Sequence, residues 1–213
     1  IADLMLEDLT AGSGYLRGIL PDLLDNCDLV MKIDNQYRIQ TKESIAWNNE
    51  YESIRGQLSN DISRVEAERN ERIRKRLNEM VNKLSLMQGI VPRDLHLVYG
   101  PTLPADAGEK IYVWVRDGWS TDENSVIADA RQAGTTSPTL FVLLPSLAAD
   151  HLRQNIIQYK AALLTLERRG VPGTEEGQEA RSAIDTKKST AEQKINELLD
   201  NILGCAKVFQ GGG

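Results

Sequence analysis

Apolar positions in the middle of the chain follow a helical period. Between residues 42 and 88 they recur at steps of three and four, which places them on one face of an α-helix. The members of this stripe are Trp47, Tyr51, Ile54, Leu58, Ile62, Val65, Ile73, Leu77, Met80, Val81, Leu84 and Met87. Thr41 is a good N-cap for such a helix, and Gly56 is a weak point in its interior. The pattern predicts one connecting helix of about 47 residues, about 70 Å long at 1.5 Å per residue.

The residues before this helix, 1–41, predict a winged-helix-like head. Helical spacing marks three short segments: residues 1–9, the next apolar stretch, and a third helix that begins at Pro21. Two strand-like segments follow at 29–33 and 36–40, joined by a two-residue Asp-Asn turn. Helices followed by a short β-hairpin are the order of a winged helix.

The residues after the long helix predict a small α/β unit over 89–145. The β-branched and aromatic segment 111–115 and the continuous apolar run 140–144 are typical of strands in a sheet. A helix is predicted between them over 125–133, so the two strands should form a parallel pair. A shorter strand candidate lies at 95–99.

The last third of the chain predicts an antiparallel helical hairpin over 146–206. Gly170 and Pro172 separate its two amphipathic helices, and Thr174 caps the second. Residues 207–213 begin a strand whose pairing partner we expect outside this chain. The predicted fold class is therefore α+β and mostly helical.

Composition is that of an ordinary globular segment. Apolar residues make up 41% and charged residues 26%, and no apolar run approaches the roughly 18 residues of a membrane span. No signal peptide is visible, so we expect a cytoplasmic protein without a membrane partner. Both ends of the chain look like boundaries inside a longer protein. Cys27 and Cys205 lie on apolar stretches, which favours buried, reduced thiols, and with His96 and His151 they show no metal-ligand spacing.

The net charge of −6 is unevenly distributed along the chain. The head carries −4, which argues against DNA reading by a winged helix. The one basic excess is a patch on the long helix formed by Arg69, Arg72, Arg74, Lys75 and Arg76. Arg69, Arg72 and Arg76 share one helix face and could contact phosphates. The alternative is a solvated helix face in which Glu68 pairs with Arg72. Glu71 would then pair with Lys75 in the same way.

A second candidate site is the turn after strand 111–115. Functional residues in α/β units often lie at the carboxyl ends of strands, so Arg116, Asp117 and Trp119 could contact an anion or a partner. The alternative is a structural turn in which Trp119 covers the core. No histidine or cysteine lies nearby in sequence to act as base or nucleophile, so an enzyme domain is the weakest interpretation of this loop.

Several strings in fixed order carry a resemblance to a known family. They are Tyr37–Thr41 with Trp47 after it, Val113–Trp119, Ser137–Pro145, Gly177–Arg181 and Val208–Gly213. Their order resembles the region C-terminal to the ATPase domain in the large P-loop protein of BREX phage-defence systems (BrxC, also called PglY). The similarity runs through essentially the whole chain.

The resemblance implies a much larger bacterial parent that works with other BREX proteins, including an adenine-specific DNA methyltransferase, to mark host DNA and block phage. ATP and Mg²⁺ are expected for that parent only, because this chain has no Walker A sequence. Its nearest match, Gly100 to Lys110, has the wrong spacing and no Ser or Thr after the lysine. The chain itself is expected to be non-catalytic and to couple the motor to partner proteins and to the rest of its own chain. Self-association through the long helices is a further expectation. The alternative is a nucleic-acid-binding module that uses the basic patch, with the 29–40 hairpin as a wing.

Overall fold

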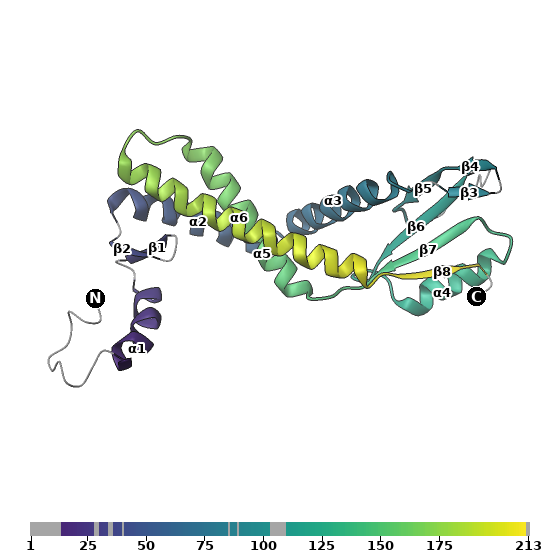
Figure 1. The fold of residues 1–213 in the computed structure, drawn as a ribbon, viewed down its shortest axis with the longest axis horizontal. Helices are drawn as coiled ribbons and strands as arrows, with labels where there is room; N and C mark the ends of the chain where they lie inside the picture. Colours follow the sequence, from purple (N-terminus) through teal and green to yellow (C-terminus); the bar gives the residue numbers. More distant parts are fainter. Residues whose placement is uncertain are drawn as a thin grey trace. The chain divides into compact units, whose positions relative to one another are not determined.

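The computed structural model describes residues 14–27, 30–33, 36–39, 41–84, 86–88, 90–102 and 110–211. These residues form a mostly helical α+β protein (Figure 1). In chain order its elements are α1 (Gly14–Asp25), β1 (Val30–Ile33), β2 (Gln36–Ile39), α2 (Lys42–Asn60), α3 (Ile62–Val81), β3 (Leu86–Gln88), β4 (Val91–Arg93), β5 (Leu95–Val98), β6 (Ile111–Asp117), α4 (Glu123–Ala133), β7 (Thr139–Leu144), α5 (Ala149–Arg169), α6 (Glu175–Gly204) and β8 (Lys207–Gln210). None of the helices in these described ranges is long and apolar enough to cross a membrane.

The chain divides into two compact bodies. The first is made of Ile1–Gln57 and Gln158–Ser189, and the second of Leu58–Ile157 and Thr190–Gly213. Each body has buried apolar side chains of its own, and each is described here by itself.

The first body begins with α1 and a pair of strands. β1 and β2 pair antiparallel with Ile33 opposite Gln36, so both strands expected in the head are present. The turn between them lies outside the described residues, as does the helix expected over 1–9. The Tyr37 hydroxyl on β2 lies 2.7 Å from a carboxylate oxygen of Asp25, which joins the strand pair to α1.

The sequence predicts that a helix begins at Pro21, but the structure places Pro21 inside α1. Proline has no N–H and therefore gives up one helical hydrogen bond. Main-chain bonding resumes within the next turn, where the Asn26 N–H donates to the Asp22 carbonyl at 3.3 Å. The loss of one hydrogen bond does not interrupt the helix, so the second and third predicted helices form a single helix, α1.

The prediction of one unbroken helix over 42–88 is also wrong, because α2 ends at Asn60 and α3 begins at Ile62. Asp61 between them has non-helical angles, φ −105° and ψ 79°, and its carboxylate accepts the Arg64 N–H at 3.1 Å. Short polar side chains favour such local bonds over a continued helix. Asp61 is thus an N-cap that starts α3, whereas Gly56, the expected weak point, lies inside α2.

The far end of the predicted helix is a strand. α3 ends at Val81, and β3 pairs antiparallel with β4, with Gln88 opposite Val91. Leu84 and Met87 fit a helical stripe by spacing alone, but both are exposed, so no buried face holds them in a helix.

The core of the first body lies among parts of three helices. Its buried side chains are Trp47, Tyr51 and Ile54 from α2, Ala161, Ala162 and Thr165 from α5, and Ala180, Ala183 and Ile184 from α6. The predicted signals between α5 and α6 are confirmed: Gly170 ends α5 with φ +66°, and the Thr174 hydroxyl accepts the Gly177 N–H at 3.1 Å. A hydrogen bond of 2.6 Å between the Thr174 hydroxyl and a Glu43 carboxylate oxygen joins the start of α6 to α2.

The second body contains a four-stranded sheet in the order β5-β6-β7-β8. β5, β6 and β7 run parallel, which confirms the expected parallel pair and extends it by one strand. β8 pairs antiparallel with β7, with Phe209 opposite Phe141. The expectation that this last strand pairs outside the chain is therefore wrong: its partner is β7.

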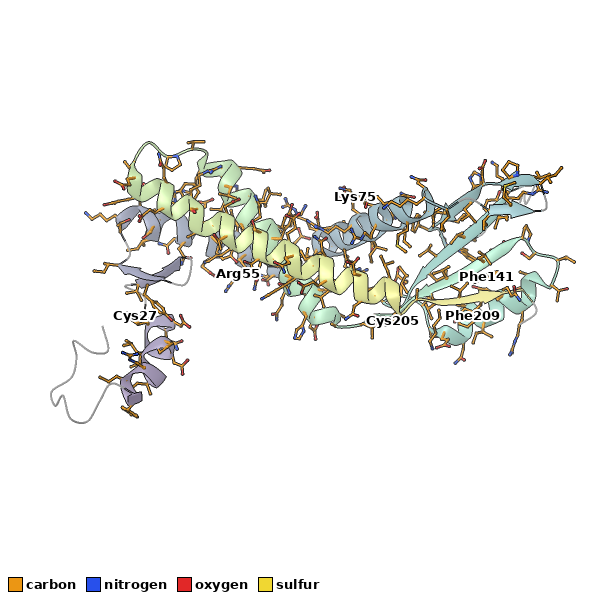
Figure 2. All side chains as sticks on the ribbon, in the orientation of Figure 1. Cys27, Arg55, Lys75, Phe141, Cys205 and Phe209 are labelled. Atoms are coloured by element: carbon orange, nitrogen blue, oxygen red, sulfur yellow. The ribbon has the colours of Figure 1, made fainter. Side chains whose placement is uncertain are left out.

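One face of the sheet packs against α4, which Figure 1 shows beside β7 and β8. The buried side chains of this core are Trp114, Val126, Ala130, Phe141 and Leu143. Val98, Ala133 and Phe209 are partly buried against them, and Figure 2 labels Phe141 and Phe209 on the neighbouring strands.

The turn after β6 approaches the end of β7 closely. The Gly118 N–H donates to the Leu144 carbonyl at 2.7 Å. A Cβ added at Gly118 would lie 2.8 Å from that carbonyl oxygen and 3.1 Å from the Ser146 nitrogen. Both neighbours are backbone atoms that cannot rotate away, so this position requires glycine.

We therefore expect Gly118→Ala to lower the free energy of unfolding by about 1–3 kcal/mol, the usual cost of overpacking. Gly204→Ala is the control in the same body, since nothing lies within 4 Å of its added Cβ and α6 already holds it in a helix. It should leave stability unchanged or raise it by up to about 1 kcal/mol. Urea denaturation of both variants measures the difference; equal stabilities would contradict the backbone clash.

Candidate functional site

The basic patch on α3 is largely engaged in contacts within the second body. Arg72 Nε lies 2.7 Å from a carboxylate oxygen of Glu68, which is the ion pair expected from the sequence. Arg76 lies 2.6 Å from a carboxylate oxygen of Asp200 on α6, a partner that no sequence spacing predicts. Two of the five basic side chains are therefore paired with acids.

Two more members of the patch stack on aromatic rings. The Arg69 guanidinium lies 4.4 Å from the ring centre of Trp119, and that of Arg74 lies 5.0 Å from the ring of Tyr99. Lys75 is exposed, and no ion pair joins it to Glu71 in the described part of the chain, so the second expected pair does not form. The patch is thus mostly a set of structural contacts.

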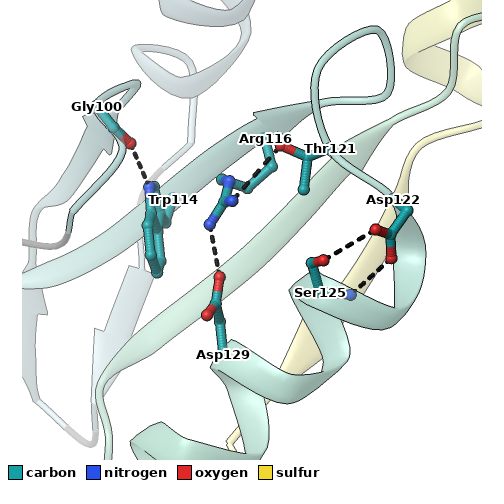
Figure 3. Close-up of polar contacts among 7 residues, drawn as sticks. All are labelled: Gly100, Trp114, Arg116, Thr121, Asp122, Ser125 and Asp129. Carbon is teal, nitrogen blue, oxygen red and sulfur yellow. Dashed lines mark hydrogen bonds and ion pairs between the residues drawn. The ribbon is translucent and has the colours of Figure 1, made fainter.

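The turn predicted as a second site is also held by internal bonds (Figure 3). Arg116 lies 2.5 Å from a carboxylate oxygen of Asp129 on α4, and its guanidinium lies 4.7 Å from the ring of Trp114. The Asp117 carboxylate accepts the main-chain N–H groups of Trp119 at 3.1 Å and Ser120 at 2.9 Å. These two residues therefore orient the turn, which is what the structural interpretation of the loop expects.

The same close-up shows how α4 is started. The Asp122 carboxylate accepts the Ser125 N–H at 2.9 Å and the Ser125 hydroxyl at 3.0 Å (Figure 3). These hydrogen bonds hold the pKa of Asp122 below its usual value, because they favour the ionised carboxylate. The cap fixes the end of the connection that leaves the Trp119 turn.

Trp119 lines a pocket of about 200 Å³ in the second body. The residues around it come from α3, from the turn and from the start of α5. They are Ile62, Val65, Glu66, Arg69, Trp119, Ala149, Asp150, Arg153 and Ile156. The structure thus brings together two residues that the sequence placed in separate candidate sites, Arg69 and Trp119.

The pocket lining combines apolar and charged side chains. Val65 and Ile156 are buried, whereas Ile62 is 53% exposed. Arg153 donates to the Ser59 carbonyl at 3.1 Å, and Arg69 Nε donates to the Asn70 side chain at 3.1 Å. The lining holds two arginines and two acids, so its charges balance.

A smaller cavity of about 50 Å³ lies at the carboxyl ends of the parallel strands. Its lining residues are Asn70, Ile73, Arg74, Tyr99, Val115, Asp117 and Leu144. The Tyr99 hydroxyl is buried there, and none of the described residues forms a hydrogen bond with it; burial raises the pKa of Tyr99. The volume of this smaller cavity is enough for only one or a few water molecules.

The lining of the pocket beside Trp119 contains no histidine, cysteine or hydroxyl. Its two carboxylates, Glu66 and Asp150, are the groups of the lining that could exchange a proton. Among the described residues, no group of three or more metal-ligating side chains comes together. Cys205 is exposed and Cys27 is half-buried, so the expectation of two buried thiols is wrong; each follows the end of a helix, where an apolar stripe no longer guarantees burial.

Sequence reasoning missed part of this site. Arg153 and Asp150 lie at the start of an ordinary amphipathic helix, and nothing in their spacing marks them. Trp119 was singled out by its place after a strand, and Arg69 by local charge, but no pattern in the sequence shows that the two side chains meet. Comparisons with protein-family models, with curated proteins and with solved structures found no match.

The contact between Arg69 and Trp119 can be measured by a double-mutant cycle. We expect Arg69→Ala and Trp119→Leu to be coupled by about 0.5–1 kcal/mol in the free energy of unfolding, the usual size of a partly exposed cation–π contact. Arg64→Ala removes an exposed arginine from the same helix, away from the pocket lining, and should be additive with Trp119→Leu. Additivity of the Arg69 pair would show that the stacking has no energetic weight.

Proposed function

We propose that this chain is a non-catalytic interaction and scaffolding segment of a large BREX P-loop ATPase, which acts in bacteriophage resistance. In this role it couples the motor to partner proteins. The ordered strings that resemble the BrxC/PglY family give the proposal its context. Its finer parts, a winged-helix-like head on residues 1–41 and an antiparallel packing of α5 and α6, belong to the same proposal.

The observation that carries a partner-binding role is a run of exposed apolar side chains. It starts in the last turn of α3 and continues through β3 and β4. Its members are Met80, Leu84, Leu86, Met87, Ile90 and Val91, with Ile90 92% exposed and Leu84 62% exposed. Single exposed apolar residues are ordinary, but six of them within twelve positions of the chain support a partner contact in this region. We call these six residues the apolar run.

The expected partners follow from the resemblance. They are other BREX proteins and the remainder of the parent chain, in the cytoplasm. ATP and Mg²⁺ would be bound by the parent's motor and not by these residues. Self-association through the long helices is the further proposal.

The alternative function is nucleic-acid binding through the basic patch. Exposure of Arg74 and Lys75 favours it. The contacts of Arg72 and Arg76 with acids weigh against it, since a phosphate would have to compete with Glu68 and Asp200 for them. Partner binding is therefore the better supported of the two.

The proposal predicts capture of another BREX protein through the apolar run. Substituting Ser for Leu84, Met87 and Ile90 should weaken that capture on the order of 100-fold, since each buried interface side chain contributes about 1 kcal/mol. The control variant carries Ser at three exposed apolar positions outside the run, Tyr15, Val171 and Val208. It should bind as the wild type does. Affinity is measured by biolayer interferometry with each purified BREX protein in turn.

The proposal fails if the wild-type segment binds none of those proteins and its deletion leaves phage defence intact. Fluorescence polarisation with labelled duplex DNA, at about 50 and about 200 mM salt, addresses the alternative. Binding that weakens steeply with salt and is lost in Arg74→Ala/Lys75→Ala would favour nucleic acid over protein as the ligand.

A further inference from the structure

The pocket beside Trp119 has the size and lining of an anchor site. Its volume is about 200 Å³. Drug-sized ligands occupy larger pockets, from about 300 Å³ upward, whereas an apolar cavity of about 150 Å³ is enough for benzene. The space therefore fits one aromatic ring or one branched aliphatic side chain.

The apolar part of the lining favours an apolar occupant. Val65, Ile62 and Ile156 provide aliphatic surface, and Trp119 adds an aromatic wall. Val65 and Ile156 are buried and Ile62 is 53% exposed, so Ile62 offers apolar area that an occupant would cover. Removing such area from water stabilises a complex by about 25 cal/mol per Å².

The charges around the base are balanced. Arg69 and Arg153 stand against Glu66 and Asp150, and no ion pair joins them in the described part of the chain. Phosphates would be attracted by the arginines and repelled by the acids. A lining that combines exposed apolar area with charges of both signs is compatible with a protein–protein contact.

We propose that this pocket is the anchor site for one large apolar side chain of a partner protein. The inference rests on the partner-binding role proposed above and locates a second contact on α3, near its start, while the apolar run begins at its end. Charged residues that flank the partner's apolar side chain could pair with the arginines or with the acids of the lining. Because no net charge drives the contact, its affinity should depend little on salt.

The first test uses indole as the probe and NMR of the tryptophan Nε1–H groups as the readout. The chain has three tryptophans, and Trp119→Phe assigns the relevant signal. Indole should shift the Trp119 signal with a dissociation constant of about 1 mM, because a single ring makes few contacts. That constant should change less than about twofold between 50 and 500 mM salt.

Ala149→Phe fills the pocket from α5 without removing a side-chain contact, and it should abolish the indole shift. Ala67→Phe places the same ring on the exposed face of α3 and should leave binding unchanged. Circular dichroism checks that both variants fold. No shift in the wild-type chain, or the same shift in Ala149→Phe, would overturn the site. A shift caused by 10 mM inorganic phosphate in place of indole would overturn the apolar assignment.

The second test separates this inference from the proposed function. If a BREX protein binds the wild-type chain, Ala149→Phe should weaken that binding at least about tenfold and Ala67→Phe should not. Indole binding together with unchanged partner affinity in Ala149→Phe would sink the anchor role while the proposed function stands. Absence of any wild-type partner would sink the proposed function, and the anchor role that rests on it.

Discussion

The hydrogen bond from the Gly118 N–H to the Leu144 carbonyl, at 2.7 Å, positions the turn of the second body that carries Trp119. It ties the turn after β6 to the last residue of β7, so the two strands end together. Only a residue without a Cβ fits this approach. The next side chain, Trp119, is then held beside the strand ends, where Arg69 stacks on it. The bond fixes the main chain next to Trp119, whose side chain lines the pocket.

Other bonds also hold the turn after β6 in place. Asp117 accepts two main-chain N–H groups of the turn, and Arg116 is held by Asp129 of α4. A site that depends on a loop is usually mobile, but here the loop is bonded to both neighbouring elements. Preorganisation of this kind lowers the entropy cost of binding, since the wall need not be ordered when a ligand arrives.

The sequence predicted the sheet better than the helices. Segments 111–115 and 140–144 are strongly β-branched and apolar, and both are strands, because local propensity and burial favour the same structure there. The ends of the long helices are harder to predict from sequence. A stripe at steps of three and four persists across Asp61, so periodicity cannot reveal a break that a single carboxylate–N–H bond creates. Leu86 and Met87 fit a helix or a strand equally well, and only pairing with β4 decides between them.

The basic patch shows why local charge is a poor guide to ligands. Five cations within eight residues suggest a phosphate-binding surface. Tertiary structure instead brings Asp200 to Arg76, Trp119 to Arg69 and Tyr99 to Arg74, contacts that lie far apart in sequence. An arginine that already stacks or pairs must give up that contact to bind a phosphate, so its attraction for nucleic acid is reduced. Besides the exposed Arg74 and Lys75, α3 presents apolar surface at two places, the apolar run at its end and Ile62 in the pocket lining near its start. Burying the apolar area at these two places is favourable, and this is the basis of the proposal that a partner protein covers them.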